Sequence, residues 1–236
     1  MIKEALQYIV CLRKPEVMEI AGQPYSDKEL HRISYNPKAK PIELTTLTSL
    51  LDYIRALPNE FRGKMILHIR SPRCVQLYSE LDDDRERECL VRVTANIPDF
   101  DYGRFINHEE FCIGLQSKFV NSDDRALLLQ FAGTVEVGTV AQYGDDGVTQ
   151  RATIKTGIAS KGDAIVPSPC FLRPYRTFLE VEQPASQFVF RMRGDNSISC
   201  ALFEADGGAW QMEAMENIRK WLENILKDDP NIIIIS

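Results

Sequence analysis

The chain has 236 residues, with 28 Lys and Arg against 34 Asp and Glu, which gives a formal net charge of −6 at pH 7. Apolar residues make up 44% and charged residues 26%, a composition typical of a globular protein and not of a disordered chain or a collagen-like fibre. No apolar run approaches the roughly 18 residues needed to span a bilayer, and the N-terminus lacks the pattern of a secretory signal. We therefore expect a cytoplasmic protein with no membrane partner.

Residues 1–60 predict an N-terminal α/β unit packed on the rest of the chain. Apolar residues at helical spacing favour a helix over 2–13, followed by two short strands at 17–21 and 25–33. A second helix is expected after Thr45 or Thr46, since the hydroxyl of either can cap it. Its apolar face consists of residues three and four positions apart: Leu47, Leu50, Leu51, Ile54 and Leu57.

Residues 61–236 predict the main domain, which begins with a β meander over 64–95. Alternating apolar and polar residues indicate its strands, and tight reversals between them imply antiparallel pairing. A helical insertion follows at about 104–132. Asn107 and Ser122 precede its two helices and can cap them.

The second half of the chain returns to β structure and ends in a helix and a strand. Glycine-containing hairpin tips separate several of the expected strands, which lie at 134–143, 148–156, 177–182, 187–193 and 197–204. A C-terminal helix is expected at about 209–228, before a terminal strand. These elements predict an α+β fold: a mostly antiparallel sheet core with a helical insertion and a C-terminal helix followed by a terminal strand.

Four consecutive isoleucines near the end of the chain are an aggregation hazard if they are left exposed. We expect a buried strand here, which either completes the chain's own sheet or pairs with another subunit. The predicted oligomerisation surface combines this strand with an aromatic residue of the preceding helix: Trp221, Ile232, Ile233, Ile234 and Ile235.

Metal and catalytic chemistry have weak support in the sequence. His108 and Cys112 stand four residues apart on an expected helix, but a zinc site requires further ligands that no spacing supplies. The six cysteines are widely spaced, and we interpret them as reduced thiols. The sequence contains no hydrolase motif and no phosphate-binding P-loop. We therefore assign no catalytic residue, metal or cofactor, and favour a protein that is not an enzyme.

Basic residues gather on the expected strands and loops between residues 151 and 193, and they form the main candidate for a ligand-binding site. Guanidinium groups match phosphate and carboxylate geometry, and a tyrosine can stack on a base. The candidate residues are Tyr143, Arg151, Lys155, Lys161, Arg173, Tyr175, Arg176, Arg191 and Arg193. Lys161 is expected in a glycine-bracketed loop. Alternatively, Glu180 and Glu182 pair with these cations and leave an ordinary solvated surface.

Several segments resemble a family of uncharacterised phage and prophage proteins, described as YfdQ-like. The resemblance covers most of the chain from about residue 60 onward and rests on whole segments, not on a catalytic motif. Those segments are 111–119, 127–135, 143–150, 152–157, 172–178 and 202–210. The resemblance implies a phage origin and expression in the cytoplasm of a bacterial host, but it implies no activity and no catalytic residue.

Together, these patterns predict a non-enzymatic homo-oligomer that binds an anionic, nucleotide-like ligand, for example to sequester a host defence signal. One alternative is an accessory protein of phage DNA recombination or replication, although the net negative charge disfavours long nucleic acids. Another is a self-assembling structural protein.

Overall fold

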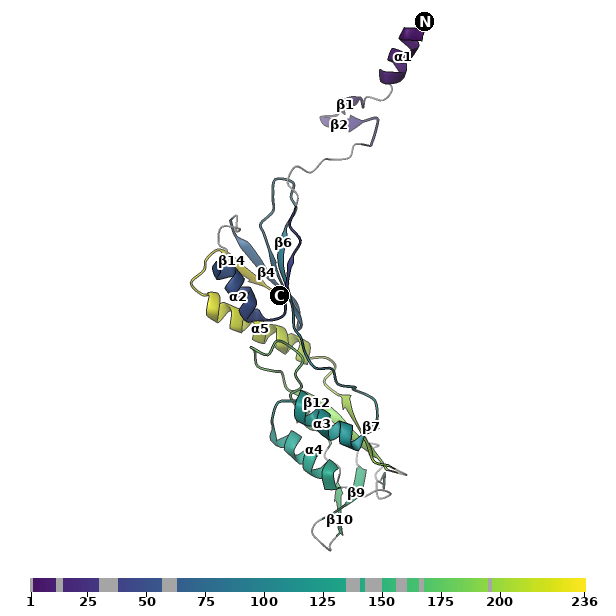
Figure 1. Ribbon diagram of the computed structural model, residues 1–236, viewed down its shortest axis with the longest axis vertical. Helices are drawn as coiled ribbons and strands as arrows, with labels where there is room; N and C mark the ends of the chain where they lie inside the picture. The colour runs from purple at the N-terminus through teal and green to yellow at the C-terminus, as the bar shows by residue number, and fades with distance from the viewer. Residues whose placement is uncertain are drawn as a thin grey trace. The chain divides into compact units, whose positions relative to one another are not determined.

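A computed structural model describes residues 2–11, 15–29, 38–56, 63–134, 141–142, 150–155, 161–165, 168–194 and 197–236. The chain divides into two compact units, Met1–Lys38 and Ala39–Ser236. The fold is α+β, with mostly antiparallel sheets, and it ends in a helix followed by a strand, as predicted. Figure 1 shows the order of the elements along the chain.

The first unit contains helix α1 (Ile2–Cys11) and a hairpin of strands β1 (Val17–Ile20) and β2 (Gln23–Ser26). Ala21 and Gly22 have φ angles of 52° and 77°, which is the left-handed backbone of a tight hairpin turn. The backbone amide of Glu16 donates to the Asp27 side chain and closes the open end of the hairpin. The turn thus begins at Ala21, one residue earlier than the gap between the expected strands at 17–21 and 25–33.

The second unit begins with a mixed five-stranded sheet in the order β14-β4-β5-β6-β3. The antiparallel centre is the predicted meander, and the two edge strands pair in parallel with their neighbours. Helices α2 and α5 pack on one face of this sheet, where both contribute to a single apolar core (Figure 1). The elements of this layer are β3 (Ile42–Leu44), α2 (Leu47–Ala56), β4 (Met65–Ser71), β5 (Cys74–Tyr78), β6 (Cys89–Thr94), α5 (Trp210–Leu226) and β14 (Ile232–Ile235).

Helix α2 belongs to the core of this second unit, although the sequence grouped it with residues 1–60. Leu47 and Leu50 are fully buried there, beside the strand residues Leu67 and Val91. The Thr46 hydroxyl accepts the backbone amide of Ser49, as expected for a capping residue. The observed unit boundary therefore lies between Lys38 and Ala39, ahead of α2.

A four-stranded antiparallel sheet in the order β11-β12-β13-β7 is built from the chain between β6 and α5. Helices α3 and α4 share its apolar core. Asn107 and Ser122 cap these helices through the backbone amides of Glu109 and Arg125, which confirms both predicted caps. The elements are β7 (Ile106–Asn107), α3 (His108–Lys118), α4 (Asp123–Thr134), β11 (Cys170–Leu172), β12 (Ser186–Arg193) and β13 (Ser199–Glu204).

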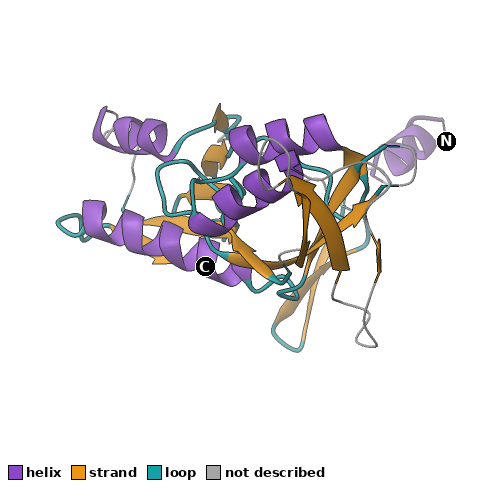
Figure 2. Cartoon of the chain, turned by 90° about the horizontal axis from the view of Figure 1, so that it is seen from below, coloured by secondary structure: helices purple, strands orange, loops and turns teal. Residues whose placement is uncertain are grey.

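A three-stranded antiparallel sheet contains β8 (Ala141–Gln142), β9 (Gln150–Lys155) and β10 (Lys161–Ile165). Lys161 opens β10 and stands opposite Lys155 in the ladder, so its assignment to a glycine loop was wrong. Thr134 ends helix α4, where its hydroxyl bonds back to the Gln130 carbonyl, and does not begin a strand. Figure 2 shows the helices and strands of the described residues by type.

The predicted strand at 177–182 is also wrong, because the segment has no ladder partner and follows an irregular path. The buried Gln183 amide explains this path. Its oxygen accepts the backbone amides of Arg176 and Thr177, and its nitrogen donates to the carbonyls of Phe178 and Val181. One side chain thus supplies the hydrogen bonds that a neighbouring strand would otherwise provide.

Candidate functional site

Strand β12 separates its apolar and basic residues onto opposite faces. Phe188, Phe190 and Met192 are buried in the core that α3 and α4 share. Arg191 and Arg193 alternate with them, Arg191 half-buried and Arg193 exposed, so both belong to the other face of the sheet. The register places them opposite Ala201 and Ser199 of β13.

Two phenylalanines join these arginines on the same face. The Arg193 guanidinium lies 3.9 Å from the centre of the Phe105 ring, which in turn contacts the Phe203 ring edge-to-face at 6.2 Å. Phe203 stands opposite Val189 in the ladder. We call the set Phe105, Val189, Arg191, Arg193 and Phe203 the arginine–phenylalanine face.

The sequence pattern identifies the arginines of this face but neither of its two phenylalanines. Phe105 precedes the two-residue strand β7, where no periodicity is long enough to assign a face. Phe203 sits near the end of β13, and its alternation with the buried Leu202 and Cys200 is the signal that identifies its side of the sheet.

Arg173 and Arg176 lie apart from this face, and both have carboxylate partners. Arg173 forms an exposed ion pair with Glu182 at 2.8 Å, which matches the alternative of neutralisation by a nearby glutamate. The side chain of Arg176 is only 3% exposed and pairs with Glu204 at 2.9 Å. Neither guanidinium is left without a counter-charge.

Arg176 occupies an aromatic cage. Its guanidinium carbon lies 4.7 Å from the ring centres of Tyr102 and Trp210 and 5.1 Å from that of Phe188. Nε donates to the Tyr102 hydroxyl and Nη1 to the Ser186 hydroxyl. Since Trp210 opens α5 while Phe188 and Tyr102 belong to the four-stranded layer, this arginine joins the two layers of the second unit.

The positive charge of Arg176 also acts on the nearby carboxyl group of Asp206. Burial would raise the pKa of this carboxyl, but the backbone amides of Gly208 and Trp210, the Ser186 hydroxyl and the Arg176 charge hold the pKa below its usual range. The carboxylate thus remains ionised and fixes the turn that leads into α5.

The remaining predicted ligand residues are not gathered into one site by the described structure. Tyr175 is half-buried and donates its backbone amide to the Lys118 carbonyl. Tyr143 lies outside the described residues. Arg151 and Lys155 belong to β9, for which only the backbone arrangement is described.

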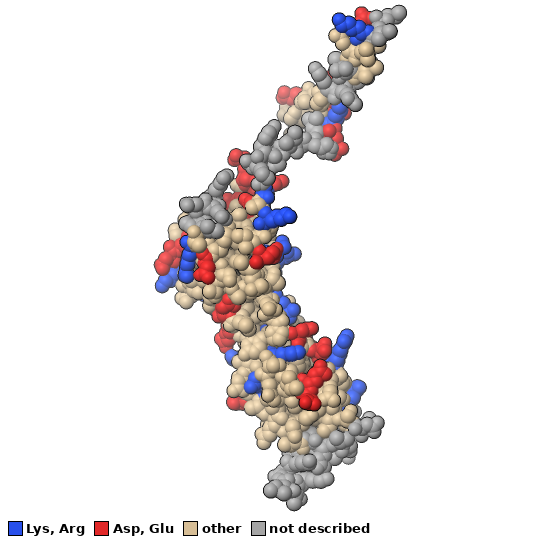
Figure 3. Space-filling model, in the orientation of Figure 1, with Lys and Arg blue, Asp and Glu red and all other residues tan. Residues whose placement is uncertain are grey.

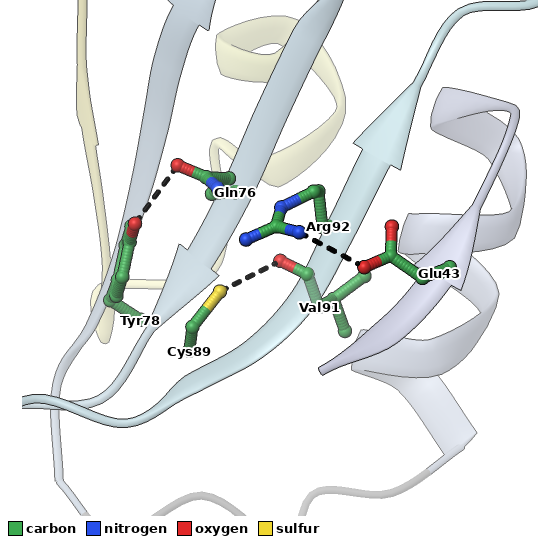
Figure 4. Close-up of polar contacts among 6 residues, drawn as sticks. All are labelled: Glu43, Gln76, Tyr78, Cys89, Val91 and Arg92. Atoms are coloured by element: carbon green, nitrogen blue, oxygen red, sulfur yellow. Dashed lines mark hydrogen bonds and ion pairs between the residues drawn. The ribbon is translucent and has the colours of Figure 1, made fainter. Parts of the chain in front are cut away.

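The face of the five-stranded sheet opposite α2 and α5 holds several separate polar contacts (Figure 4). The Tyr78 hydroxyl donates to the Gln76 amide oxygen at 2.9 Å, and Gln76 is only 2% exposed. Arg92 pairs with Glu43 at 3.2 Å. Burial raises the pKa of both Tyr78 and Cys89, so the phenol and the thiol stay protonated near neutral pH.

A shallow pocket of about 360 Å³ lies at one end of this sheet face. Apolar and charged side chains line it together: Lys64, Ile66, Glu80, Leu81, Arg87 and Ile233. Both signs of charge are present at its rim, so its lining selects no single ligand charge.

The cysteines and histidines give no metal centre within the described residues, which contain no cluster of three or more potential ligands. His108 Nε2 lies 3.7 Å from Cys112 Sγ on α3. Burial raises the pKa of the Cys112 thiol, which disfavours the thiolate that nucleophilic catalysis or metal binding requires. Cys74, Cys89, Cys112, Cys170 and Cys200 are free thiols.

Charged side chains of both signs are interspersed on the face shown in Figure 3. Among the described residues, that face presents no broad area of one sign, in keeping with the modest net charge of −6. No helix of the described segments is long and apolar enough to cross a membrane. No family model matches the chain, and comparisons with curated proteins and with solved structures return no match.

Proposed function

We propose that this chain is a non-enzymatic binding protein for a small anionic, nucleotide-like ligand, with the arginine–phenylalanine face as the binding surface. The observation that supports the proposal best is the exposed Arg193 guanidinium above the half-buried Phe105 ring. A cation and aromatic rings side by side offer phosphate recognition and base stacking at one place.

The expected strength of such a site follows from its parts. Stacking of a base on an aromatic ring contributes about 1–3 kcal/mol, and a charge-assisted hydrogen bond from a guanidinium to phosphate about 1.5–3 kcal/mol. One stack and two such bonds contribute at most about 9 kcal/mol, and immobilising the ligand costs at least about 4 kcal/mol, which leaves dissociation constants of roughly 0.2 mM or weaker. A ligand with two bases or two phosphates makes more of these contacts and binds more tightly.

A compact anion suits this surface better than a long polyanion. Binding along a nucleic-acid backbone draws on many cations, whereas Arg173, Arg176 and Arg92 are already paired with carboxylates. The resemblance to phage and prophage proteins adds a biological version of the proposal, in which the protein sequesters a nucleotide that signals infection in the bacterial cytoplasm.

Titration calorimetry with linear and cyclic mono- and dinucleotides tests the proposal. Arg193→Gln should weaken binding about tenfold, since it removes one charge-assisted bond. Arg70→Gln is the matched control, because Arg70 is an exposed strand arginine of the other sheet. The proposal fails if the wild-type protein shows neither heat nor thermal shift with any of these nucleotides, or if both variants bind equally well.

A second candidate is binding of single-stranded DNA in phage recombination or replication. The specific observation in its favour is that two phenylalanines and two arginines lie on one sheet face, an arrangement that can stack successive bases. Its affinity for an oligonucleotide should fall steeply with added salt, whereas that for a mononucleotide should change little. Fluorescence anisotropy at two salt concentrations separates these functions.

Self-association remains a prediction for either function. Trp221, Ile232 and Ile234 pack against the core of the five-stranded layer, whereas Ile233 and Ile235 are each 43% exposed. The terminal strand completes the chain's own sheet, as one of the two expected arrangements had it. Because it lies at the edge of that sheet, it is less buried than the sequence suggested.

A further inference from the structure

The outer edge of β14 carries no charge and no proline. β14 is an edge strand of the five-stranded sheet, and all four of its residues are isoleucine. Natural proteins commonly protect such edges with charged residues, prolines or bulges within the strand, because an open edge pairs readily with another chain. This strand contains none of these features, so any protection must come from elsewhere.

The parallel ladder determines which backbone groups face outward. Ile232 and Ile234 stand opposite Met65 and Leu67, and the Met65 amide donates to the carbonyl of Asn231. In a parallel pair with this register, the amide and carbonyl of Ile232 and Ile234 point away from β4. These four groups are the ones that an added strand would bond.

Two of the four outward groups are already occupied. The Ile232 amide donates to the Asp229 carbonyl at 3.4 Å, and Arg219 of α5 donates from Nη1 to the Ile234 carbonyl at 3.3 Å. Arg219 also donates from Nη2 to the Ser236 hydroxyl, so its guanidinium lies along the last residues of the strand. Glu223, one turn along α5, holds Arg219 by an ion pair at 3.6 Å.

We infer that the edge of β14 is a strand-pairing surface for a second copy of this chain and that Arg219 keeps this surface closed. The partner is the same strand of the second copy, running antiparallel about a two-fold axis. An uncharged strand does not repel itself, and antiparallel pairing satisfies the outward groups of both copies at once. Pairing would join the two five-stranded sheets into one continuous sheet and cover Ile233 and Ile235 further.

Replacement of Arg219 tests this inference. Arg219→Gln keeps a polar side chain but removes the charge and the planar fork that span Ile234 and Ser236. We expect light scattering after size exclusion to show dimers of this variant at concentrations at least tenfold below any at which the wild-type protein dimerises. Lys220→Gln is the control, because its exposed ion pair with Glu216 lies on the same helix and does not reach the strand.

A second substitution identifies the surface that pairs. Ile233→Lys, placed in the Arg219→Gln background at an exposed position, brings like charges together across a β14 pair and should restore the wild-type mass. Glu223→Gln, which only loosens Arg219, should shift the mass in the same direction by less. The inference is overturned if folded Arg219→Gln matches the wild-type profile, or if Ile233→Lys leaves its dimer intact.

Discussion

Arg176 offers the sharpest test of how this chain uses its arginines, because Arg173 is three residues away and serves as a matched control. Both were expected to bind ligand, yet the side chain of Arg176 is 3% exposed whereas that of Arg173 is 44% exposed. Replacement of each by alanine compares a buried guanidinium with a surface one in the same segment of the chain.

The magnitude follows from the contacts that each variant loses. Arg176→Ala removes three ring contacts, two hydrogen bonds to hydroxyls and an ion pair with the half-exposed Glu204. Loss of one member of a buried pair costs about 3–5 kcal/mol, and solvent around Glu204 reduces this to about 3 kcal/mol. Arg173→Ala should cost below about 0.5 kcal/mol, because its ion pair with Glu182 is exposed.

Urea unfolding followed by circular dichroism measures both free energies. Arg176→Lys should cost about 2 kcal/mol, because lysine retains the charge but cannot stack a planar group among three rings. If Arg176→Ala unfolds within 0.5 kcal/mol of Arg173→Ala, the cage does not hold the two layers together and the reasoning is refuted.

Three further predictions address packing, thiol chemistry and acid stability. Gly114→Ala on α3 should destabilise the fold by about 1 kcal/mol, because a Cβ there would lie 2.9 Å from the buried Phe100 ring. Gly133→Ala on α4 meets no neighbouring atom and should stabilise the fold by about 0.5 kcal/mol. Thermal unfolding of the two variants should therefore show shifts of opposite sign. Burial raises the pKa of Cys170 and of Cys200 to about 12, so mass spectrometry should find both unmodified after native alkylation at pH 8; rapid labelling would contradict this. The lowered pKa of Asp206 stabilises the fold at pH values above the unfolded-state pKa of about 4. The difference in unfolding free energy between wild type and Asp206→Asn should therefore shrink as the pH falls through the folded-state pKa. A difference that persists at lower pH would count against this assignment.

The parts of the fold that the sequence predicted are those with a local signal. Alternation marks β12 and β4, and the burial of alternate residues in both strands follows that alternation. Asn107 and Ser122 act on amides two and three residues away, so their capping roles are visible in a short stretch of sequence. The mixed α+β class follows from these elements alone.

The parts that were missed depend on distant partners. Nothing near Arg176 in the sequence indicates that Tyr102, Glu204 and Trp210 converge on it. The β propensity of residues 177–182 was overridden by one buried amide, Gln183, whose hydrogen bonds no propensity scale includes. Phe105 of the candidate site was likewise hidden, because it reaches Arg193 only through the tertiary fold.

The topology of the five-stranded sheet also bears on the order in which the chain can fold during translation. β4 is synthesised early, but its parallel neighbour β14 and the covering helix α5 are made only after the entire four-stranded layer. The strands and helices of the four-stranded layer all lie between β7 and β13, with the three-stranded sheet inserted after α4, so this layer can close soon after its last residue leaves the ribosome. The five-stranded layer can close only after α5 and β14 have been synthesised. Until then, α5 does not cover Met65 and Leu67.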